Sequence, residues 1–416
     1  MTDQRRPAGP GTVPRAPGDV AERPRPRQAL EGLLGSFTDG NCIDVLRDGD
    51  EIFPAMLTEI AAATRSVDLL TYLWGTGRIT DVMTEALCER ARAGVRVRVV
   101  LDALGSHGIA RAQVRALRDA GALVEFFRPL SVPRLTAKNR RSHSRVLVCD
   151  ERVAFAGGTG IDEAWTGSGR TAEDWRDTSF RVRGPAVSGL RAAFATVWLQ
   201  TSHPVLTEHD RLPAMPHAGD AAVNVLRVTS QHGWNEAMLA LVVLLETARE
   251  RVRIVTPYSR LPARLMQVVQ ATARRGVQVQ LLLPGRDVVD HPLARLQGEH
   301  QHDALMSAGV EIWTYQPAML HAKVVTVDGS VTLVGSANID ARSLALNLQV
   351  EMLIHDRGTV ATLDAHLDED LALSERVDLG GWRGRGLRRR AAAAALDVLG
   401  RPVRGLGSSG VVGRRR

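Results

Sequence analysis

Hydrophobic and polar positions follow one another in two similar sets along this chain of 416 residues. Strand-like patterns occur three times in each half. They lie in residues 65–74, 91–102 and 120–127, and again in residues 251–258, 273–284 and 308–315. Helical patterns at residues 80–93 and 261–275 separate the strands. This alternation predicts an α/β fold with a parallel or mixed sheet in each half.

Irregular segments divide the chain around these repeats. Residues 1–28 are rich in Pro, Gly and Arg and lack hydrophobic periodicity, which predicts disorder. Residues 201–219 contain three prolines and are interpreted as a linker. This division predicts a first lobe at residues 29–200, a second lobe at residues 220–380 and a basic tail at residues 381–416. A duplicated α/β unit places a cleft where the two lobes meet.

Each half contains a histidine segment with the same spacing. The second segment contains His321, Lys323, Asp328, Ser336 and Asn338, and the first contains His143, Arg145, Asp150, Gly158 and Gly160. A strand that begins at His321 directs His321 and Lys323 to one face. The small residues that follow predict an anion pocket, where backbone N–H groups, Lys323 and Asn338 bind phosphate oxygens. Two histidines across a cleft supply a nucleophile and a proton donor, the minimum for two-step phosphoryl transfer without a metal.

The paired segments resemble the HKD motifs of the phospholipase D superfamily, H-x-K-x4-D-x6-G-[SG]-x-N, and the second copy fits at every position. Residues 40–370 resemble the bacterial cardiolipin synthase branch. Segments that carry this resemblance include 256–258 (TPY), 283–285 (LPG), 319–323 (MLHAK) and 175–177 (WRD). The resemblance implies two pseudo-symmetric lobes, each a mixed sheet flanked by helices, with one active site between them.

The resemblance also implies roles for the site residues. His143 would attack a phosphodiester to form a phosphohistidine, and His321 would act as general acid and then as general base, although the pseudo-symmetry leaves this order open. Lys323, Ser336, Asn338 and Gly158 would line the phosphate pocket, and Asp177 would orient a histidine. Asp150 and Asp328 complete the set of catalytic motif residues. The alternation of side chains along a strand places them on the face opposite the histidines, which favours a structural role.

The sequence departs from the family pattern at three positions. Arg145 replaces the lysine of the first motif, Gly160 replaces its asparagine, and Gln349 replaces a glutamate common in this branch. Glu351 lies two residues after Gln349 with the same parity and is therefore counted as a substrate-binding candidate. Arginine keeps the positive charge and binds phosphate with two donors, so we expect activity to survive.

Composition changes this picture in three ways. Only two of the 53 basic residues are lysines, Lys138 and Lys323, so a general preference for arginine explains Arg145 without a loss of function. The longest apolar run, residues 237–245, is far shorter than the ~20 residues that span a bilayer. The three cysteines lack the spacing of a zinc site and fit a reducing cytoplasm. We expect no metal and no organic cofactor.

The distribution of charge bears on the partners. The net charge of +7 comes from the two tails, because residues 29–380 carry −5. An acidic body argues against nucleic acid as a partner. Residues 387–399 of the tail are helix-prone and basic, which leaves a helix on an anionic membrane or a solvated tail as alternatives.

We expect a phospholipid substrate and a cytoplasmic protein at the inner face of the membrane. A nuclease of the same superfamily and a non-catalytic phosphate-binding module with a decayed first motif stay open as alternatives.

Overall fold

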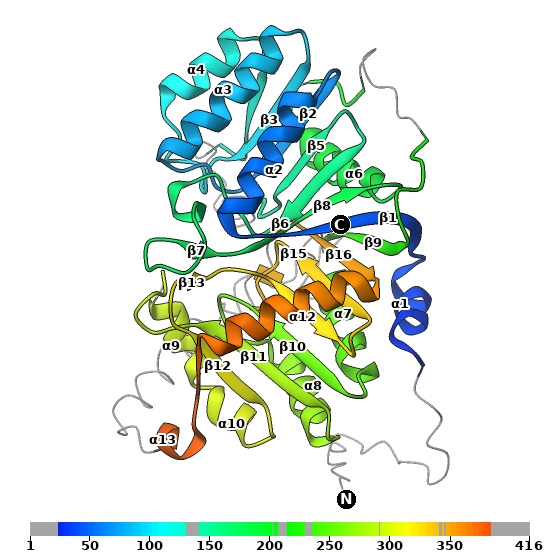
Figure 1. The fold of residues 1–416 in the computed structure, drawn as a ribbon, viewed down its shortest axis with the longest axis vertical. Coiled ribbons are helices and arrows are strands. Elements are labelled where there is room, and N and C mark those ends of the chain that lie inside the picture. The colour runs from blue at the N-terminus through cyan, green and yellow to red at the C-terminus, as the bar shows by residue number, and fades with distance from the viewer. Residues whose placement is uncertain are drawn as a thin grey trace, which may run out of the picture.

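The computed structural model describes residues 24–129, 141–201, 203–206, 214–228, 235–290, 292–340, 343–344 and 347–383. Within these residues a sheet of 15 strands runs through both halves of the chain (Figure 1). Its order is β17-β12-β11-β10-β14-β15-β16-β9-β1-β8-β6-β5-β2-β3-β4. The order on one side of the β9–β1 contact repeats on the other side, and β17 is an additional strand at one edge.

The first lobe alternates strands with helices as its sequence pattern predicts. Its elements are α1 (Pro26–Leu34), β1 (Thr38–Arg47), α2 (Asp48–Ala62), β2 (Ser66–Thr71), α3 (Arg78–Arg92), β3 (Arg96–Asp102), α4 (Arg111–Asp119), β4 (Leu123–Phe127), β5 (Val146–Cys149), β6 (Val153–Gly157), the 3-10 turn η1 (Glu163–Trp165), β7 (Trp175–Arg176), β8 (Thr178–Arg183) and α6 (Val187–Trp198). Strands β2, β3 and β4 are parallel, whereas β5, β6 and β8 pair antiparallel, so the sheet is mixed.

The second lobe repeats this arrangement. Its elements are β9 (Ala221–Val228), α7 (Glu236–Thr247), β10 (Arg251–Val255), α8 (Ala263–Arg274), β11 (Gln278–Pro284), α9 (Pro292–Glu299), α10 (His302–Met306), β12 (Glu311–Tyr315), β13 (Met319–Leu320), β14 (Val324–Val327), β15 (Val331–Gly335), β16 (Gln349–His355), α12 (Arg357–Ala372), β17 (Ser374–Arg376) and α13 (Leu379–Arg383). Parallel strands β10, β11 and β12 correspond to β2, β3 and β4. The predicted fold class, with its two pseudo-symmetric lobes, is therefore confirmed.

The lobes share one sheet and one core. Thr38 and Asn41 of β1 pair with Val223 and Ala221 of β9, which joins the two sheets into one. One cluster of buried side chains includes residues of α6, β8, β16 and α12, and so belongs to both lobes. A second cluster lies within the first lobe, and a third is formed by the second lobe together with Leu30 of α1 and Phe37. Burial of this shared apolar surface holds the lobes in one relative position.

Two helices extend into the segments that the sequence pattern assigned to the tails. Helix α1 begins at Pro26, a residue suited to the first helical position, so residues 26–28 are helical rather than disordered. Helix α13 extends to Arg383, beyond the predicted boundary at residue 380. Residues 1–23 and 384–416, with the basic segment 387–399, lie outside the described residues, as do Lys138 and residues 202 and 207–213 of the predicted linker. No helix in the described part of the chain is long and apolar enough to cross a membrane.

Asp150 and Asp328 hold equivalent turns and do not lie beside the histidines. Asp150 accepts hydrogen bonds from the backbone N–H groups of residues 64–66, just before β2. Asp328 accepts them from residues 249–251, just before β10. Each aspartate follows the end of β5 or β14 that is opposite its histidine. Their inclusion among the catalytic candidates was therefore wrong, because both carboxylates bind backbone amides in turns.

The substitution Asp150→Asn tests this structural role. Asparagine tolerates the φ of 51° at this position but replaces one acceptor oxygen with a donor, so we expect a loss of about 1–3 kcal/mol in the free energy of unfolding at neutral pH. Although burial acts to raise the pKa of Asp150, bonds from Ser66, Thr64 and Arg65 hold it below its ordinary value. The native aspartate therefore contributes stability above pH ~4, and that contribution disappears as pH falls through the lowered pKa.

Chemical denaturation at pH 7 and at pH 2–3 measures this difference. We expect the difference in free energy of unfolding between the native protein and the variant to be smaller at pH 2–3 than at pH 7. An equal difference at both pH values would contradict a role for the ionised carboxylate.

Candidate active site between the lobes

Each lobe binds the histidine segment of the other lobe through backbone hydrogen bonds. The His143 N–H donates to the carbonyl oxygen of Leu348 at 2.8 Å, and the His321 N–H donates to that of Arg176 at 2.7 Å. Strand β13, just before His321, also pairs with β7 of the first lobe. Both histidines precede the strands β5 and β14, whereas the sequence pattern placed His321 at the start of a strand. The two histidines are thus related by the same pseudo-symmetry as the sheet.

His321 is held by a buried carboxylate of the first lobe. Its Nδ1 lies 2.8 Å from Oδ2 of Asp177, and the indole N–H of Trp165 donates to the same oxygen at 2.9 Å. Burial acts to raise the pKa of Asp177, but the charge of Lys323 and the hydrogen bonds from His321 and Trp165 lower it below its ordinary value. An ionised Asp177 favours the Nδ1–H tautomer of His321, which has its lone pair on Nε2.

Lys323 lies directly against the ring of His321. Its Nζ is 2.7 Å from Nδ1 and 3.0 Å from Nε2 of that ring. Burial lowers the pKa of Lys323 to about 7, with Asp177 acting in the opposite direction. Burial and the charge of Lys323 lower the pKa of His321 to about 4. The predicted pairing of His321 with Lys323 on one face is therefore present, although these residues lie outside a strand.

His143 has a different partner. Its Nδ1 lies 2.9 Å from the carbonyl oxygen of Ser336, whereas Nη1 of Arg145 is 3.4 Å away. Because a carbonyl only accepts, the shorter contact favours the tautomer with Nδ1–H and a lone pair on Nε2. Burial, Arg145 and Lys323 hold the pKa of His143 well below its ordinary value. This tautomer leaves a lone pair on Nε2 of His143, and the ring centroids of His143 and Tyr72 lie 4.6 Å apart.

Two residues predicted to bind substrate have other partners. One Glu351 oxygen accepts the N–H groups of Ser336 and Ala337 at 2.9 and 2.6 Å, so these amides are not available to a phosphate. The Ser336 hydroxyl contacts the backbone of Val350. Burial raises the pKa of Glu351 to about 8. Glu351 and Ser336 therefore shape the turn, and Ser336 serves the site through the carbonyl that holds His143.

Gly158 lies against Asp177, and Asn338 is a buried side chain of the second motif. A Cβ atom at Gly158 would lie 2.4 Å from Oδ1 of Asp177, so only glycine permits this approach. Asn338 is buried, and its Oδ1 has no hydrogen-bond partner among the residues that the structure describes. An orphaned buried amide oxygen can accept a hydrogen bond from a bound molecule.

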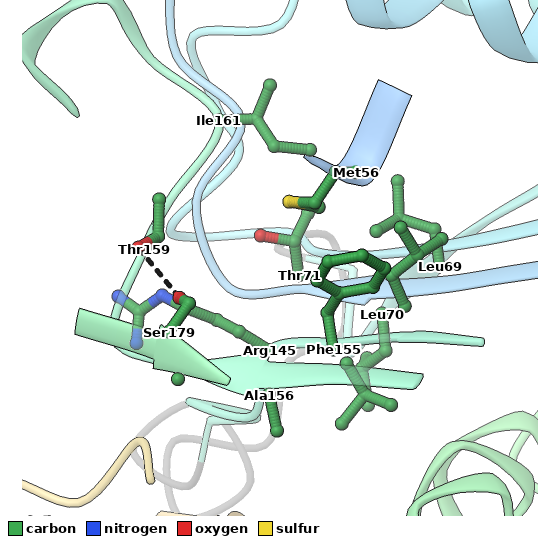
Figure 2. A pocket seen from close by; sticks show the side chains of 13 residues that line it. Met56, Leu69, Leu70, Thr71, Arg145, Phe155, Ala156, Thr159, Ile161 and Ser179 are labelled. Carbon is green, nitrogen blue, oxygen red and sulfur yellow. Dashed lines mark hydrogen bonds between the residues drawn. The ribbon is translucent and has the colours of Figure 1, made fainter. Parts of the chain in front are cut away.

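Arg145 is accommodated by extra space in the first lobe. It lines a cavity of about 30 Å³ together with Thr71, Thr159 and Ser179, and the last two hydroxyls lie 3.0 Å apart (Figure 2). The equivalent cavity beside Lys323 is only about 10 Å³. Burial lowers the pKa of Arg145 to about 10, which leaves it charged at neutral pH. The larger guanidinium group of Arg145 thus has more free space beside it than the ammonium group of Lys323 has.

The charges at the site favour an anionic ligand. Lys323, Arg145, His143 and His321 interact electrostatically with one another and with Asp177. The two histidines and Lys323 have lowered pKa values because burial and like charges oppose protonation. A bound phosphodiester would supply the opposite charge that favours their charged forms. The buried basic side chains outnumber the one carboxylate among them, so the site favours an anionic ligand.

Sequence reasoning missed the contributions of Trp165, Tyr72 and the Ser336 carbonyl. Trp165 follows the first motif by five residues, and its position in a short turn after Gly160 was the only signal in the sequence. The carbonyl contact depends on the packing of one lobe against the other and has no side-chain signature.

Comparison with known proteins gives a consistent picture. The family described as "Cardiolipin synthase, PLD-like domain" matches residues 56–172 and 241–371. The major cardiolipin synthase of Bacillus subtilis is 28% identical over 348 residues, which cover 82% of this chain and 71% of that protein. The cardiolipin synthase of Geobacillus kaustophilus is 29% identical over 358 residues, which cover 85% of this chain and 71% of that protein.

Solved structures share the fold. The phosphatidylserine synthase of Haemophilus influenzae aligns with a TM-score of 0.65 at 13% identity, over 90% of this chain and 99% of that one. A polyphosphate kinase from Porphyromonas gingivalis aligns with a TM-score of 0.55 at 13% identity, over 81% of this chain and 49% of that one. At this identity the likeness concerns the arrangement of the lobes.

Two substitutions should move the pKa of His321 in opposite directions. In Asp177→Asn the pKa should fall below its value of about 4, because the carboxylate stabilises the imidazolium. In Lys323→Met the pKa values of His321 and His143 should both rise, because a positive charge that opposes their protonation is removed. NMR titration of the imidazole resonances measures both shifts. Shifts of the same sign in the two variants would contradict this electrostatic account.

Proposed function

Because the chain belongs to the family of cardiolipin synthases with a phospholipase D-like domain, we propose that it transfers phosphatidyl groups between phospholipids through a phosphohistidine intermediate. The observation that carries this proposal is the difference between the two histidines. His143 faces a backbone carbonyl, whereas His321 faces the carboxylate of Asp177, which stabilises its protonated form. One histidine is thus suited to attack phosphorus and the other to carry a proton.

The first step forms the covalent intermediate. Nε2 of His143 attacks the phosphorus of a bound phospholipid, and the P–N bond forms as the bond from phosphorus to the head-group oxygen breaks. His321 gives its Nε2 proton to the departing alkoxide. Arg145, Lys323 and the amide of Asn338 stabilise the charge on the phosphate oxygens. The anionic lipid itself raises the pKa of His321 and so supplies the protonated acid that this step needs.

The second step returns both histidines to their starting forms. Neutral His321 takes a proton from the hydroxyl of an acceptor, and the acceptor oxygen attacks phosphorus while the P–N bond breaks. When the acceptor is the glycerol head group of another phospholipid, the product is a cardiolipin. When it is water, the product is a phosphatidate. The cardiolipin synthases among the relatives favour the lipid acceptor.

The substrates imply where the protein works. Phospholipids reside in bilayers, so the proposal includes a peripheral contact with the cytoplasmic face of a membrane. The basic residues 381–416 are the candidate segment for this contact, because each basic residue near an anionic surface contributes about 1 kcal/mol.

Product analysis tests the proposed function. Vesicles of phosphatidylglycerol should yield cardiolipin and glycerol, and His143→Ala and His321→Ala should each lower turnover by at least about 100-fold, since each removes a group that supplies ~10²–10⁴-fold. Mass spectrometry of the lipids measures the products, and Asp150→Asn is the matched control outside the site. Single-stranded DNA in a parallel reaction distinguishes a nuclease, which would release nucleotides.

Two results would contradict the proposal. Unchanged turnover in both histidine variants would refute the mechanism. Lipid binding without any product, under conditions where the protein is folded, would favour the non-catalytic alternative.

A further inference from the structure

The two lobes differ at one pair of positions next to the active site. In the second lobe the motif residue Asn338 is followed five residues later by Ser343. In the first lobe the same positions are Gly160 and Trp165. Gly160 is smaller than its counterpart Asn338, whereas Trp165 is larger than its counterpart Ser343. Such an exchange conserves the volume between the two positions, as close-packed interiors require.

Residues 160 and 165 compete for the same space. A Cβ atom at Gly160 would lie 3.1 Å from two carbon atoms of the Trp165 ring and 3.3 Å from Cβ of Leu73. An asparagine at position 160 would therefore push against the indole. Trp165 is itself buried, with 2% of its surface exposed, and packs edge-on against His321 with ring centroids 5.2 Å apart. The indole thus fills the volume that the missing asparagine leaves and extends to the active site.

The hydrogen bonds at these positions also correspond between the lobes. Trp165 donates its indole N–H to Oδ2 of Asp177 at 2.9 Å, and in the second lobe Gln349 donates to the Ser343 hydroxyl at 2.6 Å. Asp177 and Gln349 each directly follow the residue whose carbonyl binds the opposite histidine N–H, Arg176 and Leu348. In the first lobe, the Asp177 oxygen that accepts from Trp165 also contacts His321. In the second lobe Gln349 is held by Ser343, and His143 binds the Ser336 carbonyl instead.

We propose that Trp165 replaces the missing asparagine of the first motif as a positioning residue: the indole fills the space above Gly160, and its N–H fixes the Asp177 carboxylate that holds His321. This proposal rests on the proposed function, in which His321 carries the proton. The Asp177 oxygen that accepts from Trp165 is the one that contacts His321, so the indole sets where this oxygen lies. The first motif is thus altered rather than decayed.

The substitution Trp165→Phe removes the N–H and keeps most of the ring. A hydrogen bond to a charged group is lost, so we expect kcat to fall by about 10- to 100-fold with little change in KM. The carboxylate of Asp177 becomes less stable without this donor, so the acidic limb of the pH–kcat profile should move to higher pH. A purely structural role for Trp165 would not move that limb.

Trp74→Phe is the matched control. Trp74 is buried in the same lobe, and its indole nitrogen has no hydrogen-bond partner within the described part of the chain. We expect this variant to keep the activity and the pH profile of the native protein. Thermal melting of both variants shows whether either change alters folding.

A pair of further variants tests the exchange of volumes. Gly160→Asn alone should lower activity, because the new side chain displaces the indole. The double variant Gly160→Asn/Trp165→Ser copies the second lobe and should be more active than either Gly160→Asn or Trp165→Ser alone. If the double variant is no more active than Trp165→Ser, the proposal that Trp165 fills the space of the missing asparagine is wrong.

The outcomes separate this proposal from the proposed function. If the native protein transfers phosphatidyl groups and Trp165→Phe is as active as Trp74→Phe, the positioning role is wrong while the function stands. If the native protein shows no transfer, a ¹³C NMR titration of the Asp177 carboxyl still decides the matter. The pKa of Asp177 should be higher in Trp165→Phe than in the native protein, and an unchanged value would overturn the role of Trp165.

Discussion

The contact between Asp177 and His321 is the interaction on which the rest of the site depends. It joins a carboxylate of one lobe to a histidine of the other, so it exists only when the lobes are packed together. Because Asp177 fixes one nitrogen of the ring, the other nitrogen is left to exchange protons with a bound molecule. His143 lacks a carboxylate and faces a backbone carbonyl instead, and the proposed mechanism rests on this difference between two symmetry-related histidines.

Buried ion pairs and hydrogen bonds next to Asp177 hold this contact in place. Arg176, next to Asp177 in sequence, is fully buried and forms an ion pair with Asp370 of α12 in the second lobe, with Nη2 and Oδ2 2.9 Å apart. The Asp177 N–H donates to Asp48 at the start of α2. Buried ion pairs contribute little net stability because desolvation opposes them, but they define one geometry well. Together with the shared sheet and the common hydrophobic cluster, they hold Asp177 and His321 at a fixed separation.

Much of this arrangement could be predicted from the sequence, because its signals are local or repeated. The period-two runs correspond to β2, β3, β4, β10, β11 and β12, and the equal spacing after His143 and His321 predicted two related active-site segments. Glu351 was assigned to the substrate because parity says on which face a side chain lies but not what it meets there. The contact of His143 with Ser336 and that of Trp165 with Asp177 depend on tertiary packing, and no sequence period encodes them. Arg145 could be judged only after the cavity beside it was visible.

The covalent intermediate is the most direct test of this account. The native protein is mixed with phosphatidylglycerol vesicles, quenched under alkaline conditions that preserve phosphohistidine, digested and analysed by mass spectrometry. The account predicts a phosphatidyl group on His143, none on His321, and none on either residue in His143→Ala. A modified His321, or product formation with no modified histidine at any time during turnover, would contradict it.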